Sequence, residues 1–88
     1  MTTRESLEQF LSQCEQTVDY AREQLIDGSK QGHFHDQEYS EAQQMLEEQY
    51  NQLMAVYRSA NAIQRDRLHR MRLKIQSLQN EMTLLDHH

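Results

Sequence analysis

Apolar side chains recur along this chain at alternating steps of four and three residues, which is the spacing of one face of an α-helix. The first such stripe consists of Leu7, Leu11, Cys14, Val18, Ala21 and Leu25. Thr2 and Glu5 fit a capping box near its start. Gly28 supplies a stop, because glycine readily takes the left-handed conformation that ends a helix. The pattern predicts a first helix over residues 3–27 and a loop over residues 28–35.

The second part of the chain contains no glycine or proline from Phe34 to His88, so no strong helix breaker interrupts it. A second stripe consists of Tyr39, Ala42, Leu46, Tyr50, Leu53, Tyr57 and Ala60. A third stripe consists of Leu68, Met71, Ile75, Leu78, Met82 and Leu85. Both stripes have helical spacing, and the absence of strand patterns predicts an all-α protein.

The second and third stripes are separated by a gap that only the polar Gln64 bridges. The residues in this gap are adequate helix formers, which favours one continuous helix over residues 36–85 with a stutter at the gap. The alternative is a break near residues 60–66, with Asn61 or Asp66 as the N-cap of a third helix.

Helix lengths decide what each alternative needs. A helix over residues 36–85 would be about 75 Å long and the helix before it only about 36 Å, at a rise of about 1.5 Å per residue. Folded back as an antiparallel hairpin with coiled-coil-like packing, the shorter helix would leave the third stripe uncovered. Such an apolar surface is too large for a monomer. We therefore predict a homodimer through this stripe, and a compact three-helix bundle as the alternative, in which residues 68–85 fold back within the chain.

Composition favours a soluble protein of the cytoplasm. The chain has 88 residues and reads as one domain over residues 1–88. Its single cysteine, Cys14, cannot form a disulfide within the chain, which suits a reducing compartment. No apolar run approaches the roughly 20 residues needed to span a bilayer, and the N-terminus lacks the apolar segment of a signal peptide.

Charge is distributed unevenly around the net value of −5. Residues 1–56 carry eleven acidic and three basic side chains, whereas residues 57–88 carry three acidic and six basic ones. The favoured interpretation is attraction between helices of one assembly. The alternative function is nucleic-acid or polyanion binding through the basic segment 65–74, whose cations are Arg65, Arg67, Arg70, Arg72 and Lys74. The overall acidity opposes that alternative.

Candidate catalytic and metal-binding chemistry is sparse. Cys14 lies on an apolar stripe with no histidine or cation one turn away, so nothing there activates a thiol. His33 and His35 are candidate metal ligands near Asp36 and Glu38, but structural sites usually need four converging ligands and a supporting shell. We predict no catalytic residue, no metal and no cofactor, and therefore no enzyme.

Two segments carry a resemblance to a known family: Asp36-Gln37-Glu38-Tyr39-Ser40-Glu41-Ala42-Gln43, and Arg70-Met71-Arg72-Leu73-Lys74-Ile75-Gln76-Ser77-Leu78-Gln79-Asn80. They resemble the uncharacterised YtzC-like family of small helical proteins from bacilli, and the similarity extends over most of the chain. The resemblance implies a cytosolic bacillar protein without an assigned reaction and carries over no functional residue. Together with the stripes, it predicts a non-enzymatic protein-interaction module with an unidentified protein partner.

Overall fold

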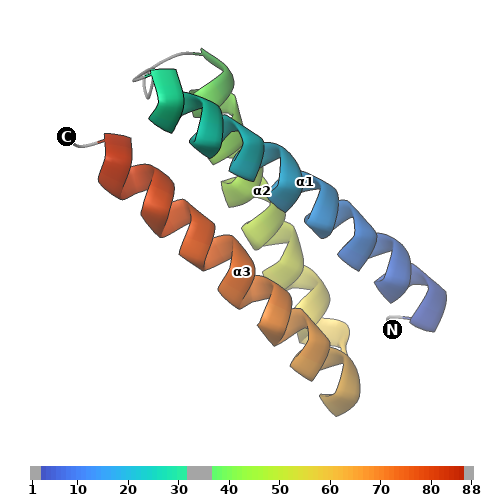
Figure 1. The fold of residues 1–88 in the computed structure, drawn as a ribbon. Coiled ribbons are helices and arrows are strands. Elements are labelled where there is room, and N and C mark those ends of the chain that lie inside the picture. The colour runs from blue at the N-terminus through green and yellow to red at the C-terminus, as the bar shows by residue number, and fades with distance from the viewer. Residues whose placement is uncertain (1–2, 32–36, 87–88) are drawn as a thin grey trace.

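Three helices make up this computed structural model, which describes residues 3–31 and 37–86. They are α1 (Arg4–Gln31), α2 (Gln37–Ser59) and α3 (Ala62–Asp86). They lie side by side in a rod of 43 × 18 × 15 Å, and no strand occurs in the described ranges. Figure 1 shows α1 and α3 running in the same direction, with α2 returning between them. The protein is all-α, as the sequence predicted.

A two-residue turn replaces the continuous helix that was expected over residues 36–85. Helix α2 ends at Ser59 and α3 begins at Ala62, so the chain takes the alternative of a break near residues 60–66. A reciprocal capping box explains the start of α3. The Asn61 backbone N–H donates to Oε1 of Gln64 at 3.0 Å, and the Gln64 N–H donates to Oδ1 of Asn61 at 2.9 Å.

Helix α1 extends further than predicted, through Gly28 to Gln31, so the expected loop over residues 28–35 is wrong at its start. Gly28 lies three residues beyond Leu25, at the next position of the apolar stripe, and it is buried. The helix therefore continues through Gly28 despite the poor intrinsic helix propensity of glycine. At the other end, Oγ1 of Thr3 accepts a hydrogen bond from the Ser6 N–H at 3.1 Å and caps the helix.

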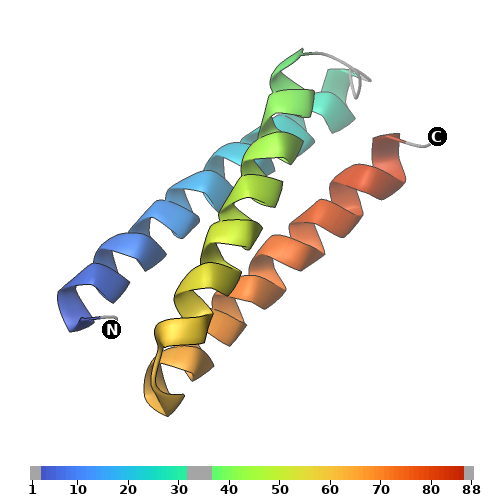
Figure 2. The ribbon, with the colours of Figure 1, turned by 180° about the vertical axis from the view of Figure 1, so that it is seen from behind.

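The hydrophobic core forms where the three stripes meet between the helices. Figures 1 and 2 show the arrangement of these helices from two opposite sides. The stripe of α3 is part of this core. Ile75 is completely buried and Leu78 nearly so, within a single chain. The premise of the predicted dimer, an uncovered third stripe, is therefore wrong for this structure. The buried apolar residues are Leu7, Leu11, Cys14, Val18, Ala21, Leu25, Tyr39, Ala42, Leu46, Leu53, Ala60, Leu68, Met71, Ile75, Leu78 and Met82.

Two buried hydrogen bonds tie the helices together inside this apolar core. The Tyr39 hydroxyl donates to the carbonyl oxygen of Met82 at 2.7 Å, which joins the start of α2 to the end of α3. The Thr17 hydroxyl donates to Oε1 of Gln49 at 2.9 Å, which joins α1 to α2. Buried polar groups are costly without partners, so both pairs favour one register of helix against helix. No helix within the described ranges is long and apolar enough to cross a bilayer.

Candidate functional site: the third helix and its contacts with the first

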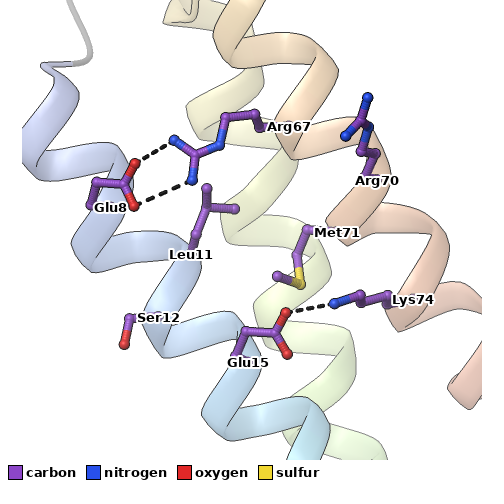
Figure 3. Close-up of a pocket in the computed structure, with 8 residues that line it drawn as sticks. All are labelled: Glu8, Leu11, Ser12, Glu15, Arg67, Arg70, Met71 and Lys74. Atoms are coloured by element: carbon purple, nitrogen blue, oxygen red, sulfur yellow. Dashed lines mark hydrogen bonds and ion pairs between the residues drawn. The ribbon is translucent and has the colours of Figure 1, made fainter.

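Two ion pairs spaced one heptad apart join α1 to α3. Both terminal nitrogens of Arg67 donate to the carboxylate of Glu8, one of them to Oε2 at 3.2 Å. Seven residues further along each helix, Nζ of Lys74 donates to Oε1 of Glu15 at 2.7 Å. Figure 3 shows both pairs bridging from one helix to the other. Acidic groups on α1 thus meet basic groups on α3 at these two positions, in line with the expected attraction between helices.

A third pair of opposite charges continues this spacing. Arg22 lies seven residues beyond Glu15 on α1, and Glu81 lies seven residues beyond Lys74 on α3. The signs are reversed, with the cation now on α1. Both side chains line the same shallow depression, while the guanidinium of Arg22 lies 3.8 Å from Asp19 of its own helix. This alternation of signs matches a parallel register of α1 against α3 and disfavours a shift by one heptad.

The ion pairs flank an open depression of about 360 Å³ between α1 and α3. Leu11 and Met71, both part of the core, contribute its apolar lining. Its full lining consists of Glu8, Leu11, Ser12, Glu15, Arg67, Arg70, Met71 and Lys74. Because its ionised groups largely bind one another across the depression, the polar surface here holds two helices together.

The contact between Glu8 and Arg67 shifts the pKa values of both side chains. The hydrogen bonds from Arg67 hold the pKa of Glu8 below its ordinary value, and the same contact raises the pKa of Arg67. Both side chains are about half exposed, so solvent and salt weaken the interaction. The pair therefore contributes more to the choice of register than to stability.

The remaining cations of the basic segment also have partners within the chain. Arg65 donates to the carbonyl oxygens of Tyr57 at 3.0 Å and Arg58 at 3.3 Å, and its guanidinium lies over the Tyr57 ring. These contacts satisfy carbonyls at the end of α2 that have no helical partner. Arg70 lies 3.1 Å from Asp66, one turn away in α3.

The last of these cations, Arg72, is half-buried, and its terminal nitrogen lies 2.8 Å from Nδ1 of His69. The five residues predicted to bind a polyanion thus lie along one helix but engage α1, α2 and α3 separately. This arrangement divides the basic segment among three structural roles and leaves less of its charge for a polyanion.

Cys14 is completely buried, and burial raises the pKa of its thiol from 9.0 to about 12. The neighbouring charge of Glu15 adds to that shift. A thiol in this state is a poor nucleophile and serves the core as a small apolar side chain. Among the described residues, no group of histidine, cysteine and carboxylate side chains could hold a metal ion. The two candidate ligands His33 and His35 lie outside the described residues.

The residues predicted to mediate self-association gather on the inner face of α3. Leu68, Ile75 and Met82 are fully buried there, with Met71 and Leu78 nearly so and Leu85 partly buried. Sequence reasoning grouped these six correctly on one face. It missed the contribution of Gln64 to the capping box at the start of α3, although Asn61 followed three residues later by glutamine is a recognisable signal. Self-association through this face stays a prediction.

Comparison with known proteins agrees with the resemblance found in the sequence. Residues 1–84 match the family described as "Protein of unknown function (DUF2524)". The chain belongs to this family. It is also 54% identical over 84 residues to the uncharacterized protein YtzC of Bacillus subtilis (strain 168), a match that covers 96% of this chain and 93% of YtzC. No solved structure matches the chain. The family assignment confirms the predicted relationship and assigns no reaction.

Proposed function

We propose that this member of the DUF2524 family is a non-enzymatic helical interaction module, and that α3 is the helix through which it associates. The observation that carries the proposal is the way α3 docks. Its apolar face packs into the groove between α1 and α2, and charge pairs fix its register there. This is the geometry by which amphipathic helices are recognised in grooves.

The groove between α1 and α2 is complementary to α3 whether or not the three helices belong to one chain. Glu8 and Glu15 bind residues of α3 that are 59 positions later in the chain, and Tyr39 binds a carbonyl 43 positions later. None of these contacts requires both partners to belong to the same molecule. An α3 helix from a second copy would satisfy the same hydrogen bonds and bury the same side chains.

The closed three-helix bundle is, on this proposal, the monomeric state, and self-association through the third stripe requires α3 to leave its own groove. Burial of one large aliphatic side chain contributes roughly 1.5–3 kcal/mol, so a bare α3 is unstable in water. The α3 helix is therefore covered in both states, by α1 and α2 of its own chain in the monomer and by those of the second copy in the dimer. The dimer is a homodimer in which both α1–α2 grooves hold an α3 helix. We propose the cytoplasm as its compartment, which the unpaired thiol of Cys14 supports.

Sedimentation velocity tests the proposed function. The protein is refolded from denaturant at concentrations from micromolar to millimolar and then analysed at each concentration. We expect a dimer whose fraction rises with concentration. The substitution Leu84→Glu, on the exposed side of α3, is expected to leave the dimer intact.

A monomer at every concentration, including after refolding, would contradict self-association. A salt-sensitive complex with RNA or DNA, lost when Arg67 and Arg70 are both changed to Glu, would instead favour the polyanion function. We expect the protein to form the dimer and to form no complex with nucleic acid. A further protein partner would then bind the dimer.

A further inference from the structure

We infer that the dimer forms by exchange of α3, with the turn at Ala60 and Asn61 straightening so that α2 and α3 become one continuous helix in each chain. This inference rests on the proposed function, because it names the second copy as the occupant of the α1–α2 groove and gives the route to it. Two long helices then lie antiparallel about a two-fold axis near the former turn.

The turn itself favours this exchange. It has only two residues outside the helices, and neither is glycine or proline. The chain from Gln37 to Asp86 contains no helix breaker at any position, so straightening the turn meets no local obstacle. Short connections between packed elements invite exchange between copies, because the connection restricts closure more than it restricts an extended form.

The apolar pattern also continues across the turn. From Leu53 to Leu68, the positions Tyr57, Ala60 and Gln64 follow at steps of four, three, four and four residues. In a continuous helix these positions share one face, with a stutter that locally unwinds the supercoil. The inner faces of α2 and α3 would therefore join without a large change of side, and each half would fit the groove that it fits in the closed bundle.

Ile63 supplies an independent observation. It lies in the first turn of α3 and is 78% exposed, the most exposed large apolar residue of those that the structure describes. In the closed bundle most of its side chain is uncovered. In a continuous helix, Val56, Ala60 and Ile63 follow at steps of four and three and line one side of the straightened segment. The two straightened segments cross at the two-fold axis, so this side of each chain meets the other copy there.

Specific contacts hold the closed form and set the balance between the two states. The capping box of Asn61 and Gln64 and the bonds from Arg65 to the last carbonyls of α2 exist because the helix is interrupted. When the helix is continuous, those backbone groups bond within it and the caps are lost. The core contacts are the same in both states, so changes at the turn shift the equilibrium without weakening the core.

Two hinge variants test the inference in opposite directions. Ala62→Pro suits the first position of α3, where proline is favoured, but places proline inside the continuous helix. We expect the dimer dissociation constant to rise about a hundredfold for each hinge, and about ten-thousandfold for the two hinges of a dimer. Asn61→Ala removes the cap, and we expect tighter dimerisation by about fivefold per hinge. Ala62→Ser, which leaves both states possible, is the matched control.

The exposed apolar residue gives a second test that does not touch the caps. Ile63→Glu leaves the closed monomer folded, because the side chain is exposed there, and weakens the dimer at least about tenfold. Leu84→Glu, at a similarly exposed position far from the hinge, leaves the dissociation constant unchanged. Circular dichroism of the monomer confirms that each variant is folded.

Cross-linking decides whether α3 is exchanged. One chain carries Cys14→Ser with Glu8→Cys and the other carries Cys14→Ser with Arg67→Cys. After the two are refolded as a mixture, a short bismaleimide should join unlike chains, because these positions face each other only across α1 and α3. Leu84→Cys in place of Arg67→Cys lies about 25 Å further along α3 and should give no such product.

A dimer that is insensitive to Ala62→Pro, Asn61→Ala and Ile63→Glu, and that gives no cross-link between unlike chains, would overturn the exchange while leaving the proposed function standing. A protein that never dimerises would overturn both.

Discussion

Replacing Ile75 with alanine is the most direct perturbation of the way α3 is covered. Ile75 is completely buried at the middle of the α3 stripe, whereas Leu73, two residues away on the opposite face, is 51% exposed. Truncation of a buried isoleucine to alanine removes three carbons from the core and leaves a cavity. The same truncation at Leu73 removes a side chain that water already contacts.

The expected magnitude follows from the burial. Buried isoleucine or leucine to alanine costs about 2–5 kcal/mol, and the better helix propensity of alanine returns a few tenths. We expect Ile75→Ala to lower the free energy of unfolding by about 3 kcal/mol. A chain of this length has about 4–13 kcal/mol in total, so the loss is a large part of it. The melting temperature should fall by roughly 12–24 °C, at about 4–8 °C per kcal/mol.

The assay is urea unfolding followed by circular dichroism at a concentration where the monomer dominates, with Leu73→Ala as the matched control. We expect the control to remain within about 0.5 kcal/mol of the parent protein. Equal effects of the two substitutions, or a loss at Ile75 below about 0.5 kcal/mol, would show that α3 does not pack on α1 and α2 in the monomer. Repeating the unfolding at high concentration separates the monomer from the proposed dimer, because only the stability of a dimer depends on concentration.

Two further predictions concern ionisable groups. Native Cys14 should react with iodoacetamide at least about a hundredfold more slowly than the denatured chain, and rapid native alkylation would show that the core opens around it. The free energy of unfolding should decrease as the pH rises above 9.0, because the unfolded thiol ionises there while the folded thiol stays protonated. The pKa of Glu8, measured by NMR titration, should lie below 4.5 and return toward it in Arg67→Ala, so that the contribution of this pair is present above pH 4.5 and lost as the pH falls through the lowered pKa. An unchanged Glu8 pKa in that variant would mean that the contact is absent in solution.

The apolar stripes predicted the all-α class and much of the core, because the spacing of apolar residues along the chain directly indicates one face of a helix. The α3 face of Leu68, Ile75 and Met82 was assigned correctly even though its cover was not. Gln49 shows the limit of such a pattern. It is buried although polar, because Thr17 of another helix supplies its hydrogen bond. That partner becomes visible only when the register of two helices is known.

The turn could not be decided from local sequence. The residues from Ser59 to Gln64 are compatible with a helix and with a cap, so their intrinsic preferences nearly cancel. The bend lets α3 be buried against α1 and α2 of the same chain, which is a tertiary effect that local preferences do not encode. The expected stop at Gly28 is also wrong: glycine ends many helices, but α1 continues through it to Gln31.

The parallel pairing of α1 with α3 has a consequence for synthesis. The ribosome releases α1 and α2 before α3, the helix that fills the groove between them. Until α3 has emerged, the groove between α1 and α2 of a nascent chain is vacant. On the proposal that two copies exchange α3, this is the stage at which the α3 helix of another copy can enter the groove.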